Sequence, residues 1–247
     1  MLKLYARLAG KSIRLALRGW PAAVVLPVYA MLLAMVSVRF GQDLIGGFLV
    51  SIGVALLISS YLHLISLAVA GRKIGLGDLR DSFLAHFLDV ISVLFVTWLI
   101  QWAVAGATHD LGERGKIVFI LVDLTMVVFF NPVPELIYLA QGQVRSVGLL
   151  MESGRFISAH WPEWLAPSAL MAAVVLAPTG MIHRGPIAET VLSLQNVFSL
   201  NGLALTILSI PLWLWPLMML FISWAMVFRG LLFTELTSRV RRPRQWP

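Results

Sequence analysis

The chain has no cysteine and few charged residues. Its 247 residues include no Cys, and only 13% of them carry a charge. The absence of cysteine excludes disulfides and thiolate metal sites. A soluble domain has about 25% charged residues, and 59% of this chain is hydrophobic. One water-soluble core could not bury that much apolar surface, so the composition predicts a protein of the lipid bilayer.

Motifs of common enzymes are also missing. The chain contains no HExxH, no GxSxG and no Walker lysine loop. The histidines are scattered along the chain, whereas a metalloenzyme of the membrane would need several at one depth. The sequence therefore gives no reason to expect a metal ion, another cofactor or an enzyme.

Six long apolar runs are present instead. Each has about the 20 residues that a helix needs to cross about 30 Å of hydrocarbon. Runs this continuous do not show the alternation of barrel strands. We therefore predict an all-α polytopic integral membrane protein, with one transmembrane domain over residues 1–247 and six transmembrane helices. The predicted spans are residues 20–40, 44–70, 87–107, 117–139, 164–182 and 203–228.

The basic residues predict the orientation. Six spans place the N-terminus, residues 71–86, residues 140–163 and the C-terminus on one side, with 15 of the 19 Lys and Arg residues. Basic residues collect on the cytoplasmic side of membranes. The prediction is a multi-pass protein of a bacterial inner membrane with both termini in the cytoplasm.

Two basic segments lie at the ends of the chain. Residues 1–19 have the spacing of an interfacial amphipathic helix, although a solvated extension is the alternative. Residues 229–247 are expected to form a basic cytoplasmic tail, for which an orientation anchor is a sufficient explanation. We expect the bilayer and its anionic lipids as partners, and no nucleic acid. The side chains expected to face anionic lipid are Arg7, Lys11, Arg14, Arg18, Arg239, Arg241, Arg242 and Arg244.

A weak internal repeat connects three parts of the chain. The pattern Gly-x5-Gly-x-Leu-x-Asp/Glu-Ser occurs at residues 71–82 and 142–153. Ser-x-Arg followed by Trp-Pro occurs at residues 12–21 and 153–162. We interpret this as three repeated units, each an interfacial helix followed by a transmembrane hairpin. Chance similarity of interfacial segments is the alternative. The serines that mark the three units are Ser12, Ser82 and Ser153.

Polar residues inside the predicted spans are candidates for function, because each is costly in lipid unless paired or hydrated. His63, Asp89 and Glu135 are predicted at similar depths near the inner boundary, where they could hold a cation or pass a proton. Alternatively, the acids reach the interface or pair with backbone groups and arginines. The segment 131–135 breaks a span and either lines a site or forms a kink. The candidate residues are His63, Asp89, Asp123, Asn131, Pro132, Pro134 and Glu135.

Two segments carry a likeness to a known family. Residues 75–83 (GLGDLRDSF) and 148–165 (GLLMESGRFISAHWPEWL) resemble the cytoplasmic helices of poorly characterised six-span bacterial proteins. One such protein is the membrane domain attached to some glycerophosphodiester phosphodiesterases. The resemblance covers about residues 71–180 and implies a fold without an activity. The topology is also similar to that of the permease subunits of one class of ABC exporters.

Two functions follow as hypotheses. The first is a non-enzymatic polytopic protein that acts as a transporter-like (permease) subunit or as a structural subunit of a larger membrane complex, with partner chains or as a homo-oligomer. The alternative is a membrane-embedded enzyme that acts on lipid through His63, Asp89 and Glu135. The mutual geometry of those three side chains distinguishes the two.

Overall fold

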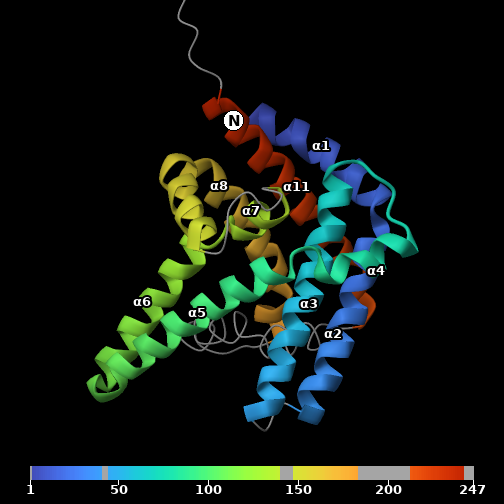
Figure 1. The fold of residues 1–247 in the computed structure, drawn as a ribbon. Coiled ribbons are helices and arrows are strands. Elements are labelled where there is room, and N and C mark those ends of the chain that lie inside the picture. The colour runs from blue at the N-terminus through green and yellow to red at the C-terminus, as the bar shows by residue number, and fades with distance from the viewer. Residues whose placement is uncertain (1, 41–43, 140–146, 183–211, 242–247) are drawn as a thin grey trace, which may run out of the picture.

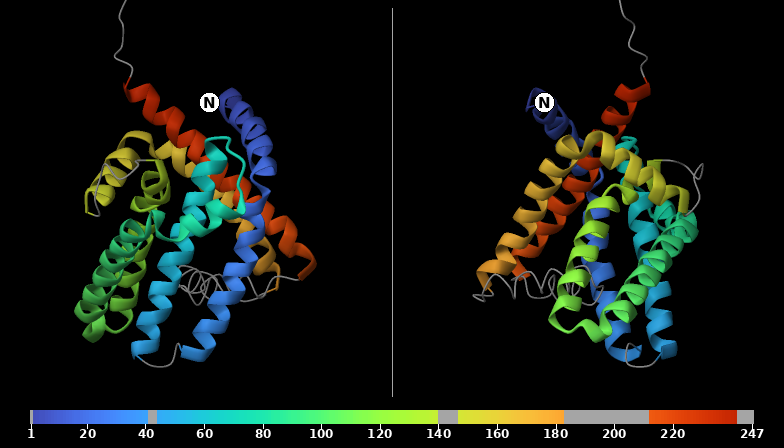
Figure 2. Two further views of the ribbon diagram at one scale, coloured as in Figure 1. Left: turned by 45° about the vertical axis from the view of Figure 1, so that its right-hand side comes forward. Right: turned by 90° about the vertical axis from the view of Figure 1, so that its left-hand side faces the viewer.

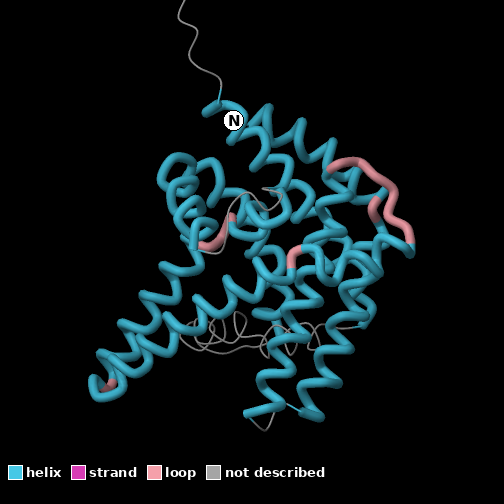
Figure 3. The backbone as a smooth tube through the Cα atoms, in the orientation of Figure 1, coloured by secondary structure: helices cyan, strands magenta, loops and turns pink. Residues whose placement is uncertain are grey.

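The computed structural model describes residues 2–40, 44–139, 147–182 and 212–241. Every regular element in these ranges is a helix, and the short connections between them are loops and turns (Figure 3). Hydrogen-bonded helices satisfy their own backbone groups, which lipid cannot do. The all-α class expected from the apolar runs is confirmed for this part of the chain.

The helices follow the apolar and amphipathic segments closely (Figure 1). In chain order they are α1 (Leu2–Arg18), α2 (Trp20–Phe40), α3 (Leu44–Val69), α4 (Leu76–Ala85), α5 (Phe87–Thr108), η1 (His109–Leu111), α6 (Glu113–Phe129), α7 (Val133–Leu139), α8 (Val147–Ile182), η2 (Leu212–Leu214) and α11 (Trp215–Arg241).

Five helical segments are long and apolar enough to cross a membrane. They cover residues 20–39, 46–69, 87–111, 113–139 and 215–238, with mean hydropathy between 1.8 and 2.1. The first four match predicted spans to within a few residues. These segments make the chain a multi-pass membrane protein.

The last two predicted spans agree less well with the structure. Residues 164–182 form the second part of α8, but they are not among the five segments. The sixth helix is displaced along the sequence, because α11 begins at Trp215 and continues to Arg241. Residues 229–241 of the predicted tail are helical, and the candidate span in α11 reaches Ser238. Residues 203–211 of the predicted span lie outside the described ranges.

Three amphipathic segments precede long apolar helices. They are α1, α4 and the first part of α8, and they lie in the half of the molecule that also holds the end of α11 (Figure 2). A similar backbone break follows two of them. His86 ends α4 with φ −129° and ψ 16°, and His160 interrupts α8 with φ −135° and ψ 21°. Each break turns the chain from a surface segment into an apolar helix.

The three serines that mark the predicted units are all fully buried. Ser12 donates to the carbonyl of Ala9 (2.9 Å), and the Ser82 hydroxyl lies 2.5 Å from that of Ser60 on α3. Ser153 donates to the carbonyl of Phe129 at the end of α6. A small hydroxyl thus lets each surface helix pack closely. The repeat itself stays a prediction.

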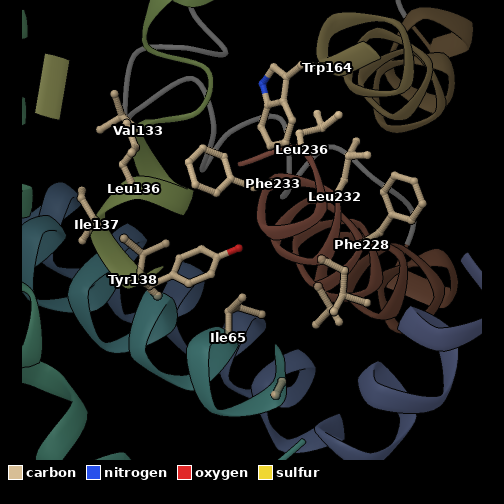
Figure 4. Close-up of a cluster of buried hydrophobic side chains, with 14 of the residues drawn as sticks. Ile65, Val133, Leu136, Ile137, Tyr138, Trp164, Phe228, Leu232, Phe233 and Leu236 are labelled. Carbon is tan, nitrogen blue, oxygen red and sulfur yellow. The ribbon is translucent and has the colours of Figure 1, made fainter. Parts of the chain in front are cut away.

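The core lies between α3, α7, α8 and α11 (Figure 4). About half of the α3 and α11 spans is buried, whereas only 6% of the α5 span is buried and the rest is partly or fully exposed. The uncovered side chains of α5 are large and apolar, as in Phe95 and Trp98. Lipid or another protein must cover this hairpin of α5 and α6.

Candidate functional site

A buried ion pair joins α7 to α11. Nε of Arg229 donates to Oε1 of Glu135 (2.8 Å), and Nη2 donates to Oε2 (2.9 Å). The Glu135 side chain is 0% exposed and that of Arg229 is 17% exposed. This two-point contact fits the planar guanidinium to the carboxylate and leaves no charge unbalanced.

The ion pair sits beside the break between α6 and α7. Pro132 and Pro134 lack the N–H groups that would continue the helix, and Val133 instead donates to the carbonyl of Phe130 (3.0 Å). Arg229 also donates to the carbonyl of Asn131 (2.5 Å). A backbone acceptor at the break therefore has a protein partner instead of water or solute.

Trp164 of α8 closes the other side of the break. Its indole N–H donates to the side-chain oxygen of Asn131 (2.7 Å), and the residue is 0% exposed. The guanidinium carbon of Arg229 lies 5.0 Å from the centre of the Trp164 ring. This distance suits a cation–π contact, which is stronger out of water. We call Asn131, Glu135, Trp164 and Arg229 the break cluster.

Apolar and aromatic side chains surround the break cluster (Figure 4). Phe156 and Phe233 pack against each other, with ring centres 4.5 Å apart, and both contact Trp164. Tyr138 points its hydroxyl toward α11 and donates to the carbonyl of Met226 (3.4 Å). The cluster is a packed joint of α7, α8 and α11.

Four of the predicted site residues lie here: Asn131 and Glu135 belong to the break cluster, and Pro132 and Pro134 form the break beside it. The alternative in which an intramembrane acid pairs with an arginine is confirmed for Glu135. Sequence reasoning missed Arg229, which it placed in the basic tail. A signal was present, because the apolar pattern resumes directly after Arg229 as GLLF. A basic residue inside an apolar helix needs an acidic partner in another span.

His63 and Asp89 are both neighbours of His86. The ring centres of His63 and His86 are 6.0 Å apart. Burial lowers the pKa of His86, the neighbouring His63 lowers it further, and the Asp89 carboxylate raises it. Nε2 of His86 is buried without a hydrogen-bond partner in the described part of the chain. Of the predicted trio, Glu135 is paired with Arg229, whereas His63 and Asp89 neighbour His86.

Asp123 lies in the α5–α6 hairpin. Nε2 of Gln101 on α5 donates to Oδ1 of Asp123 on α6, at 3.4 Å. This hydrogen bond joins α5 to α6 away from the hydrophobic core. Within the described ranges, no group of three or more His, Asp or Glu side chains is placed to hold a metal ion.

The basic residues at the ends of the chain occupy different surroundings. Arg7, Lys11, Arg14 and Arg18 are exposed on α1, and Arg7 lies 3.5 Å from Glu235 of α11. The others lie late in α11 or beyond it. Arg239 and Arg241 belong to the end of α11, and Arg242 and Arg244 lie outside the described residues.

Comparisons with models of protein families, with curated proteins and with solved structures gave no match for this chain. Its function is therefore inferred from the residues and contacts described above.

Proposed function

We propose that the protein is a non-enzymatic subunit of a larger complex in a bacterial inner membrane, with both termini in the cytoplasm. Its role in the complex is structural, and the α5–α6 hairpin is the surface on which a partner chain or a second copy docks. The observation that carries the proposal is an exposed aromatic stripe in the middle of the α5 span. The stripe consists of Phe95, Trp98 and Trp102.

These three rings form one ladder along α5. Ring centres are 6.0 Å apart for Phe95 and Trp98, and 6.5 Å apart for the stacked Trp98 and Trp102. All three side chains are more than half exposed. Trp98 lies near the middle of the segment 87–111. Tryptophan facing lipid prefers the headgroup level, where its N–H finds an acceptor. At mid-span, large aromatic side chains fit better in a protein interface, where they are common anchors.

The break cluster favours a structural role over a permease or a lipid enzyme. A substrate site at a broken helix uses free backbone groups and an available charge. Here Arg229 already engages both the Asn131 carbonyl and the Glu135 carboxylate. A general base must reach its substrate, and Glu135 is fully buried. The polar groups at the break therefore serve to join helices.

The orientation rests on the charges and on the positions of the ends. Without Arg229, 14 of the 19 basic residues still fall on the predicted cytoplasmic side. The contact between Arg7 and Glu235 supports the same side for α1 and the end of α11. Both observations fit an even number of crossings.

Photocrosslinking in native membranes tests the docking surface. A benzophenone amino acid replaces Trp98 in one variant and Met31 in the control. Both residues lie eleven positions after the first residue of their helix, and they are 56% and 55% exposed. We expect Trp98 to give one protein adduct of defined mass, and Met31 to give lipid adducts. Lipid adducts alone at both positions would contradict the proposal.

A further inference from the structure

A groove opens between α1 and the first half of α11. It has a volume of about 230 Å³, and its lining side chains include Ile13 and Leu17 from α1 and Leu217, Phe221 and Trp224 from α11. Ile13, Leu17 and Leu217 are each about half exposed or more. The groove is apolar and lies beside a helix that the sequence places at the membrane surface, so its natural occupant is a hydrocarbon chain.

A basic strip lies on the adjoining face of α1. Arg7, Lys11 and Arg14 border a shallow depression of about 450 Å³ along this helix. Their spacing of four and three residues puts them on one side of the helix. Arg14 lies three residues before Leu17 of the groove, so the end of the strip and the groove are neighbours on the helix surface. Both the lysine ammonium and the arginine guanidinium donate charge-assisted hydrogen bonds to phosphate oxygens.

Within the part of the chain that the structure describes, two of these three cations have no carboxylate within 4 Å. Arg7 lies 3.5 Å from Glu235. For Lys11 and Arg14, no acidic group of the described residues comes within 4 Å, and both side chains are exposed. Basic side chains without an acidic partner would bind the phosphate of a lipid, and the apolar groove beside them would take its acyl chain. They favour a headgroup with net negative charge, because a choline headgroup would add a cation.

We propose that α1 and α11 form a specific site for one anionic phospholipid. Its phosphate contacts Lys11 and Arg14, and one acyl chain lies in the groove between Leu17 and Phe221. This site is independent of the proposed docking at the α5–α6 hairpin, since different helices form it.

Native mass spectrometry of the purified chain tests the site. The probes are phosphatidylglycerol and phosphatidylcholine with identical acyl chains, added in mixed micelles. We expect one phosphatidylglycerol to be retained in preference to phosphatidylcholine. The double variant Lys11→Gln/Arg14→Gln should lose about 30-fold in phosphatidylglycerol binding, since each cation near an anionic headgroup contributes about a factor of five. Leu17→Trp, which fills the groove, should weaken both lipids.

Matched controls exclude a general effect of charge or size. Arg114→Gln/Lys116→Gln removes two exposed charges near the α5–α6 turn, and Val38→Trp enlarges an exposed residue of α2. Both controls should bind like the wild type. A lipid-dependent rise in melting temperature provides a second readout, expected for the wild type and absent in the double variant. Equal retention of the two lipids, an equal loss in the controls, or a dimer in place of bound lipid would overturn the proposal.

Discussion

Arg229 and Glu135 are the residues on which the joint of α7, α8 and α11 depends. Sequence reasoning found Glu135 and Asn131, because an acid and a Pro-x-Pro motif in an apolar run stand out. It missed Arg229, because an arginine at the end of an apolar run looks like the start of a tail. Arg229 is buried because it pairs with Glu135, which lies 94 residues earlier in the sequence. A local sequence pattern cannot predict a contact between residues so far apart.

Removing one partner of this pair should destabilise the fold strongly. Glu135→Leu and Arg229→Met alone each leave a buried group without its partner, at a cost of about 3–5 kcal/mol. The double variant should recover most of that loss, because neither charge then remains. Thermal unfolding in detergent measures the three variants.

An exposed ion pair provides the control for this experiment. Lys116 and Glu113 lie 2.7 Å apart, with side chains 68% and 85% exposed. The matching substitutions Glu113→Leu and Lys116→Met should change stability by less than about 1 kcal/mol. If Glu135→Leu were as mild as the Glu113 control, the break cluster would not be the joint described here.

His86 should make the α4–α5 junction sensitive to acid. Burial and His63 hold its pKa below the ordinary value of about 6.5. When the pKa of a histidine is lower in the folded than in the unfolded state, protonation favours unfolding. The fold is therefore most stable at pH values above the ordinary pKa, where the histidine is neutral in both states. That contribution is lost as the pH falls below about 6.5 toward the lowered value.

Melting temperatures between about pH 8 and pH 5 measure this effect. The wild type should lose more stability on acidification than His86→Gln, which has no proton to gain. His109→Gln, at an exposed position, should behave like the wild type. Identical pH profiles for the wild type and His86→Gln would contradict the prediction.

At the scale of helices, the ends of α2, α3 and α5 could be predicted from hydropathy to within a residue or two. Each is one apolar run. The run stays helical over its whole length because an unpaired backbone group in lipid costs several kcal/mol. The extent of α11 could not be predicted in this way. Its last turns are polar, and packing on α1 together with the Arg229 ion pair keeps them helical.

Helices approach each other closely at Gly230. A Cβ atom there would lie 2.5 Å from the Tyr138 hydroxyl and 2.9 Å from Cγ2 of Val69. Gly230→Ala should therefore force α11 away from α7 and α3, at a cost of about 1–3 kcal/mol. Gly53→Ala, where nothing lies within 4 Å, should be neutral or stabilising. Denaturation of both variants in detergent measures the difference, and equal stability would contradict the predicted contact.

At the scale of the whole molecule, the membrane class could be predicted from composition, but the arrangement of helices could not. Nothing in the sequence indicates that α5 and α6 lie outside the core while α3 lies within it. All three are equally apolar, and the difference arises from contacts between distant segments.

Cysteine labelling tests the topology. The chain has no native cysteine, so single substitutions need no altered background. Lys3→Cys and Arg80→Cys should react with a membrane-impermeant maleimide in inside-out vesicles, and Arg114→Cys only in right-side-out vesicles. All three positions are exposed. Labelling of positions 3 and 80 from opposite sides would contradict the prediction that the N-terminus and residues 71–86 share the cytoplasmic side.

The ion pair between positions 135 and 229 also sets an order of events during synthesis. Ribosomes add about 5–20 residues per second, so Arg229 is synthesised roughly 5–20 s after Glu135. During that interval the nascent chain must shelter a carboxyl group beside the insertion machinery. Chains truncated before the last helix should consequently be recognised by quality-control proteases, whereas those ending after it should persist.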